Sequence, residues 1–287
     1  MVFLSQPPLW QNVLMSVRLG DWKRGYMAVM AVYVDASGSL SELAVTPAAM
    51  VSTPEKWIQF ERKWNSCLDV FGVTSLHMKH FAFSRGEYTG WDQDQNKRRR
   101  FLNHLMTIIE DHIEYTASEA VYINDYDAFD KIYEFSETAR PYTMGCFTAA
   151  GHIFEWGRSR DLHRNDFVWL FEKGDIDQHD LRQKWNQAYP DAAVEPIFLK
   201  KIDAYPDSNL KKRQRPFEAA DLVAYENLKA HKLLDERGDS PVYEEELRKP
   251  LQRMVKWPGA DKWGFFAKDG MQRWVDASNI KLRKNTK

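Results

Sequence analysis

Three acidic residues, Asp35, Glu172 and Asp221, occupy positions from which carboxylates can do chemistry. Asp35 and Glu172 each end an apolar run typical of a buried strand, and Asp221 lies in a helical pattern of small and apolar residues. Open α/β sheets place their sites at strand ends. Carboxylates that converge there from separate elements suit Mg²⁺ or Mn²⁺, which also bind phosphate oxygens. Two such ions about 4 Å apart would activate water and neutralise the leaving oxygen of a phosphodiester.

Each of these residues also has a structural explanation. An aspartate that follows a strand, as Asp35 does, is commonly a hydrogen-bonding turn residue. Asp221 could form a buried ion pair with Lys or Arg, and Glu218 and Tyr225 share its helix face. The metal site becomes the better interpretation only when the three carboxylates are considered together.

Histidines and aromatic residues lie in a glycine-containing segment that we expect near a strand end. His77 and His80 are three residues apart, but two histidines without a third soft ligand make a weak zinc site, and a hydrogen-bonded structural histidine is the alternative. Tyr88 and Trp91 could stack on unpaired bases or pack in the core.

Basic residues are clustered along the chain, although such runs are usually solvated surface. The clusters are Lys97 to Arg100, Lys200-Lys201, Lys211-Lys212-Arg213 with Arg215, and Lys281 to Lys284. The cluster from Lys211 to Arg215 directly precedes the helix that carries Asp221. It could therefore hold the phosphates of a nucleic acid strand beside the proposed metals.

Strands and helices that alternate along the chain must position these residues. Strands are predicted at Tyr26 to Val34, Leu40 to Val45, Ile113 to Ile123, Asp166 to Glu172 and Val194 to Ile202. Helices are predicted from Pro54 to Gly72, through Phe101 to Ile109, Tyr142 to Trp156, His179 to Ala188 and Phe217 to Leu234. The first two strands should form a hairpin around the turn Asp35 to Ser39, and the tail beyond Gly238 should be helical.

The composition excludes several classes of protein. The 287 residues are 44% hydrophobic, which excludes a disordered chain. The formal net charge is −1, which excludes a protein that coats nucleic acid through a strongly basic surface. The two cysteines, Cys67 and Cys146, should be reduced core residues. No stretch approaches the roughly 18 apolar residues of a membrane span or forms a signal peptide, so a soluble, cytoplasmic protein with no membrane partner is expected.

Four segments resemble, in the same order, the motifs of the domain of unknown function 3800 family. They are Asp35-Ala36-Ser37-Gly38, Leu76-His77-Met78-Lys79-His80-Phe81 followed by Gly90-Trp91, Phe171-Glu172-Lys173-Gly174-Asp175, and Pro216 to Tyr225, and together they span about residues 26 to 233. That family is similar to ribonuclease H-like enzymes. The resemblance implies a mixed five-stranded sheet flanked by helices, with acidic residues that collect divalent ions for phosphodiester cleavage.

Carried over onto this sequence, the resemblance implies a role for each matching residue. The metal ligands would be Asp35, Glu172 (with Asp175 as the less favoured alternative) and Asp221, with Glu218 as an additional candidate. His77 would contact a substrate phosphate or shuttle a proton, and Ser37 and Lys79 would belong to the substrate surface. The commonest first motif of the family is Asp-Glu-Ser-Gly, and Ala36 departs from it. Adjacent residues of a strand face opposite sides, so the missing glutamate is not expected to be a ligand.

These inferences predict one α/β domain of ribonuclease H-like fold at residues 26–238, with an N-terminal extension (1–25) and a helical C-terminal extension (239–287) packed on the same domain. The expected function is that of a Mg²⁺- or Mn²⁺-dependent nuclease. The alternatives are a non-catalytic nucleic-acid or protein-binding module of the same fold, for example in a phage or defence system, and a hydrolase of small phosphoesters. RNA and DNA both fit this chemistry, and no feature of the sequence specifies an oligomeric state.

Overall fold

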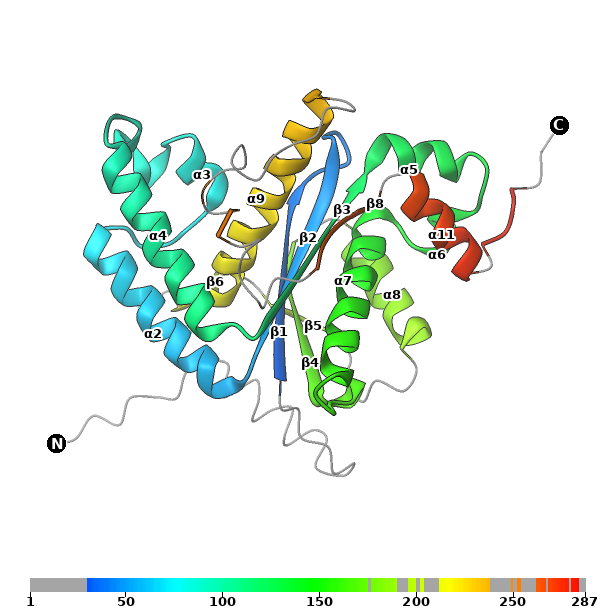
Figure 1. Cartoon of the computed structure of the whole chain (residues 1–287), viewed down its shortest axis with the longest axis horizontal. Coiled ribbons are helices and arrows are strands. Elements are labelled where there is room, and N and C mark those ends of the chain that lie inside the picture. Colours follow the sequence, from blue (N-terminus) through cyan, green and yellow to red (C-terminus); the bar gives the residue numbers. More distant parts are fainter. Residues whose placement is uncertain are drawn as a thin grey trace.

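The computed structural model of the chain contains a mixed β-sheet of six strands in the order β5-β4-β1-β2-β3-β8 (Figure 1). The strands are β1 (Met30–Gly38), β2 (Ala44–Ser52), β3 (Tyr115–Tyr122), β4 (Phe167–Glu172), β5 (Ile197–Leu199) and β8 (Lys262–Phe266). The structure describes residues 30–174, 177–189, 196–199, 202–203, 212–237, 249, 252–253, 262–266, 268–278 and 280–283. The predicted α/β class, a mixed sheet flanked by helices, is confirmed.

Strand β2 makes the sheet mixed. It pairs antiparallel with both β1 and β3, whereas β4 runs parallel to β1 and β5 runs parallel to β4. Because parallel strands end at the same edge of a sheet, the C-terminal ends of β1 and β4 lie side by side. The sequence places Asp35 and Glu172 at this edge.

The hairpin differs from its predicted bounds. Strand β1 continues through Asp35 to Gly38, because Asp35 pairs with Ala48 and Gly38 pairs with Val45 in the antiparallel ladder. The turn therefore lies beyond Gly38, and the returning strand begins at Ala44 rather than at Leu40. Asp35 is consequently a strand residue, and the prediction that it lies in a turn is wrong.

Helices cover both faces of the sheet (Figure 1). One face, which we call the α9 face, is covered by α2 (Pro54–Phe71), α4 (Gln95–His112) and α9 (Arg215–Arg237), and the other, the α7 face, by α7 (Pro141–Arg158) and α8 (Gln178–Ala188). The shorter elements are α3 (Met78–Ala82), α5 (Ile123–Asp130), α6 (Phe135–Thr138), α11 (Lys268–Ser278), η1 (Gly86–Tyr88), η2 (Trp91–Gln93), η3 (Arg164–Asp166), β6 (Ile202–Asp203) and β7 (Lys212–Arg213).

Helix α2 begins and ends where the sequence indicates. The Thr53 side chain accepts a hydrogen bond from the Lys56 amide, and Pro54 occupies the first turn, where its missing N–H has no partner to lose. Gly72 ends the helix in the left-handed conformation at φ 71°, which glycine adopts without the steric cost of a Cβ. The helix therefore presents its buried aromatic residues Trp57, Phe60 and Trp64 to the core at fixed positions.

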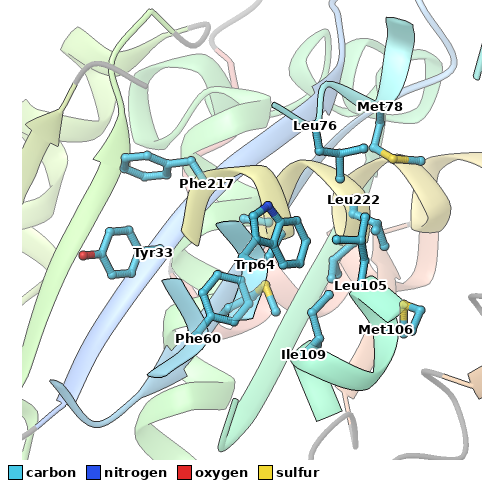
Figure 2. Close-up of a cluster of buried hydrophobic side chains, with 14 of the residues drawn as sticks. Tyr33, Phe60, Trp64, Leu76, Met78, Leu105, Met106, Ile109, Phe217 and Leu222 are labelled. Carbon is cyan, nitrogen blue, oxygen red and sulfur yellow. The ribbon is translucent and has the colours of Figure 1, made fainter. Parts of the chain in front are cut away.

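The core on the α9 face is aromatic and densely packed. The rings of Tyr33 and Phe217 lie 5.2 Å apart, and those of Phe60 and Trp64 lie 4.9 Å apart. Figure 2 shows Tyr33 and Phe217 at one end of this cluster and Leu76 and Met78 at the other, beside Leu222 of α9. These contacts fix α9 against β1 and the segment before α3 against α9.

The C-terminal extension is not purely helical. Strand β8 pairs parallel with the outer side of β3, at the end of the sheet opposite β5, and α11 follows it. The sequence pattern of this tail, rich in tryptophan, does not distinguish a short buried strand from a helix. The extension thus contributes a sixth strand to the sheet.

His231, near the C-terminal end of α9, is a buried histidine whose protonation opposes folding. It is 5% exposed, its Nδ1 lies 3.2 Å from the Tyr122 hydroxyl, and burial lowers its pKa to about 4 from the ordinary 6.5. Between pH 6.5 and pH 4 the unfolded chain binds more protons than the folded one, so stability falls as pH falls.

We expect His231 to contribute a loss of about 3 kcal/mol in the free energy of unfolding between pH 7 and pH 4. Denaturant titrations of the wild-type protein and of His231→Gln at both pH values measure this contribution, because glutamine stays neutral and can still hydrogen-bond Tyr122. An equal loss of stability in the variant would show that the imidazole is not responsible.

Candidate functional site

Asp35 and Glu172 lie at neighbouring positions on the same face of the sheet. The parallel register pairs Val34 with Phe171, so the next positions along β1 and β4 are Asp35 and Glu172. Alternation along each strand gives Asp35 the face of Tyr33, and Glu172 the face of Leu170, and both of these core residues belong to the cluster on the α9 face. Adjacent strands are about 4.8 Å apart, so the backbone positions that carry the two carboxylates are neighbours in the sheet.

Helix α9, which carries Asp221, packs along β1. Two contacts mark this packing: Phe217 against Tyr33, and Leu228, whose Cδ2 would lie 3.4 Å from a Cβ built at Gly38. The stretch from Tyr33 to Gly38 and that from Phe217 to Leu228 are both about 16 Å long.

Asp35 and Asp221 each lie about 6 Å beyond the first of these contacts, along the strand and along the helix respectively. They therefore stand at the same level of the structure. Asp35 is 3% exposed and Asp221 is 5% exposed, so both carboxylates are held in the interface between sheet and helix.

The Asp221 carboxylate is oriented by the segment that carries His77. Its Oδ2 accepts a hydrogen bond from the Met78 amide at 2.9 Å and lies 3.3 Å from His77 Nδ1. The His77 side chain is 50% exposed, whereas that of Asp221 is 8% exposed. The His77 side chain therefore lies between the buried carboxylate and solvent.

Glu218 accepts hydrogen bonds from three groups of the protein. Its Oε2 accepts hydrogen bonds from Trp64 Nε1 at 2.8 Å and from the Leu76 amide at 3.0 Å, and its Oε1 accepts one from Arg215 at 2.6 Å. The residue is 1% exposed. Both oxygens thus have donors within the protein, and the expectation that Glu218 is an additional metal ligand stays a prediction.

Glu218 and Asp221 together hold one short extended segment against α9. They lie one helical turn apart and accept the amide hydrogens of Leu76 and Met78, which are two residues apart along the chain. His77, between these two amides, has extended backbone angles of φ −139° and ψ 111°. The two carboxylates thus fix the place from which the His77 ring projects.

The predicted basic cluster is only partly contained in the described residues. Arg215 donates to Asn65, to the Thr74 carbonyl and to Glu218, so its guanidinium fastens α9 to its neighbours. Lys212 and Arg213 form β7, of which the structure describes the backbone, and Lys211 lies outside the described residues. Asp175, the alternative to Glu172, also lies outside them.

The remaining predicted site residues separate into surface and core. Ser37 shares the face of Asp35 and is half-buried, and Lys79 is exposed beside His77. Tyr88 and Trp91 are 2% and 6% exposed and pack in the core, so they cannot stack on bases.

Ala36 packs against the core cluster on the α7 face, opposite Asp35. A glutamate at that position would therefore point away from the carboxylates, as the alternation of strand residues predicts.

The donor set is suited to Mg²⁺ or Mn²⁺ in its chemistry, because Asp35, Glu172 and Asp221 supply hard carboxylate oxygens. Among the described residues, no three acidic, histidine or cysteine side chains surround a common point at which they could hold a metal together. A closed cage of the zinc type is thus absent from this part of the chain. Mg²⁺ instead keeps several waters and takes one or two carboxylates plus substrate phosphate, which a site centred on Asp35 and Glu172 can provide.

Two contributors to the site were not predicted from the sequence: Trp64, which donates to Glu218, and the main-chain amides of residues 76 and 78. The sequence does carry a signal for them, because two carboxylates three residues apart in an apolar helix require buried donors. It does not say which residues donate.

Comparison with protein-family models finds no match to this chain, and comparison with curated proteins finds none. Within the described residues, no helix is long and apolar enough to cross a membrane. A cavity of about 410 Å³ lies on the α7 side of the molecule, lined in part by Phe147, Tyr189 and Trp274, and contains none of the candidate residues.

Proposed function

We propose that the protein is a Mg²⁺- or Mn²⁺-dependent nuclease that hydrolyses phosphodiester bonds of nucleic acid. The observation that carries the proposal is the adjacent placement of Asp35 and Glu172 on one face of the parallel strands β1 and β4, beneath the helix that carries Asp221. The mixed sheet flanked by helices supports a ribonuclease H-like fold and membership of the domain of unknown function 3800 family, both of which we propose on the ordered motifs. Because a fold hosts many functions, the carboxylates are the stronger argument.

In this proposal Asp35 and Glu172 would hold the ion, and Asp221 would lie beside it on α9. A bound divalent ion would supply an activated water and charge neutralisation at the phosphodiester. The protein residues orient the site: the Met78 amide fixes one oxygen of Asp221, and the Ala36 amide donates to Asp35 Oδ1 at 2.8 Å. Both carboxylates are thereby held in place before substrate arrives.

His77 would contact the scissile phosphate or transfer a proton at the exposed edge of the site. Its ring is held against Asp221 and presents its other side to solvent. We expect His77→Asn to lower kcat about a hundredfold, because general acid–base groups contribute roughly 10²- to 10⁴-fold. Single-turnover cleavage measures the effect. A variant that cleaves at the wild-type rate would remove His77 from the mechanism.

The proposal is tested by incubating the full-length protein with labelled RNA, single-stranded DNA, duplex DNA and RNA–DNA hybrid, in Mg²⁺, in Mn²⁺ and in EDTA. We expect cleavage of at least one substrate with either metal and none in EDTA. Cleavage that persists in EDTA would contradict the metal mechanism. Binding without cleavage under every condition would favour the alternative, a non-catalytic nucleic-acid-binding module.

A further inference from the structure

The exposed side of α3 carries a row of planar side chains. His77 precedes the helix, His80 lies within it and Phe83 follows it, so the three are spaced three residues apart and share one side. The His77 and His80 ring centroids are 4.7 Å apart with planes inclined at 32°. The opposite side of α3 is buried, with Met78 and Phe81 fully enclosed in the core.

Phe83 is an exposed aromatic residue at the outer end of this row. It is 56% exposed, and the Arg85 guanidinium lies 5.3 Å from the centroid of its ring. Lys79 and Arg85 are both exposed beside the row. The nearby acid Glu87 is hydrogen-bonded to the amide and hydroxyl of Thr74. The row thus combines planar rings with positive charge, the combination that suits a flexible polyanion with flat groups.

The row begins at the candidate site. His77, its inner member, lies 3.3 Å from Asp221 of α9, and the neighbouring Met78 amide donates a hydrogen bond to the same carboxylate. A strand whose bases lie along His77, His80 and Phe83 would therefore pass its backbone close to the carboxylates.

We propose that the row formed by His77, His80 and Phe83, with Lys79 and Arg85, binds single-stranded nucleic acid and leads it to the carboxylate site. This proposal rests on the proposed nuclease function, because a strand led to the carboxylates matters only if they cleave it. Exposed rings bind unpaired bases by stacking, whereas a duplex keeps its base faces closed and offers only its backbone. Stacking is tolerant of sequence, so the preference is for strandedness rather than for particular bases.

The test measures binding separately from cleavage. Fluorescence anisotropy of labelled oligo-dT, oligo-U and a blunt duplex is recorded with the full-length protein in EDTA. We expect tighter binding to the single strands than to the duplex, and a Kd for the single strands raised about tenfold in Phe83→Ala, as expected for one lost stacking contact. Ile132→Ala, at a residue 53% exposed on another part of the surface, should leave the Kd unchanged.

An abasic strand provides the decisive comparison, because it keeps the phosphates and lacks the bases. Wild-type protein and Phe83→Ala should bind it equally. Equal affinity of the two proteins for both oligo-dT and oligo-U, or equal weakening by Ile132→Ala, would overturn the proposal. If the protein binds single strands through Phe83 but does not cleave them in Mg²⁺ or Mn²⁺, the nuclease function is refuted. The proposed binding surface would then still be supported. Comparison of oligo-dT with oligo-U tells DNA from RNA.

Discussion

Replacing Asp35 by Asn is expected to reduce metal-dependent cleavage about a thousandfold or more while the protein stays folded. Asparagine has the size of aspartate and can still accept the hydrogen bond from the Ala36 amide. It lacks the charge that a divalent ion requires of its ligand. Metal catalysis contributes several kcal/mol to transition-state stabilisation, and each 1.36 kcal/mol is worth tenfold in rate.

The experiment compares single-turnover cleavage by wild-type protein, Asp35→Asn and a matched control, Asp69→Asn, at an exposed position of α2. Thermal unfolding of all three proteins verifies that the fold is retained. Asp69→Asn should cleave normally. Wild-type cleavage by Asp35→Asn would exclude this carboxylate from catalysis, whatever the metal dependence of the reaction.

Removing the Glu218 side chain is expected to lower the free energy of unfolding by about 3–5 kcal/mol. Glu218→Ala leaves three buried or half-buried donors, Trp64 Nε1, the Leu76 amide and the Arg215 guanidinium, without this acceptor. Deleting one partner of a buried ion pair leaves the other charge buried and unpaired. Each unsatisfied buried donor adds its own desolvation cost. Denaturant unfolding at neutral pH measures the loss.

Two variants complete this comparison. Glu42→Ala removes the partner of Lys232 in an ion pair at the surface, with side chains 38% and 33% exposed, and should cost less than about 1 kcal/mol. Glu218→Gln keeps an acceptor oxygen and should fall between the wild-type protein and Glu218→Ala. If Glu218→Ala proves as stable as Glu42→Ala, the residue does not hold the segment before α3 in place.

The sequence predicts the α/β class and the positions of the carboxylates because both depend on local patterns. The apolar runs before Asp35 and Glu172 identify buried strands, and the convergence of their ends follows from the general architecture of such sheets. Thr53, Pro54 and Gly72 mark helix α2 through capping chemistry that acts within a few residues.

The role of Glu218 depends on contacts far apart in the sequence. A carboxylate on an apolar helix has the same local pattern whether it binds a metal or accepts buried hydrogen bonds. Its donors, Trp64 and the Leu76 amide, come from residues 154 and 142 positions away. The positions of the Tyr88 and Trp91 rings also depend on contacts that a local pattern does not show. Their loop sequence resembles a stacking surface, but the rings pack in the core.

The central claim, that Asp35 and Glu172 bind a divalent ion with Asp221 beside them on α9, is tested most directly by calorimetric titration of the full-length protein with Mn²⁺. We predict saturable binding to the wild-type protein, and its loss or severe weakening in Asp35→Asn and in Asp221→Asn, with Asp69→Asn binding as the wild type does. Absence of Mn²⁺ binding to the wild-type protein, or equal binding by Asp35→Asn, would contradict the account.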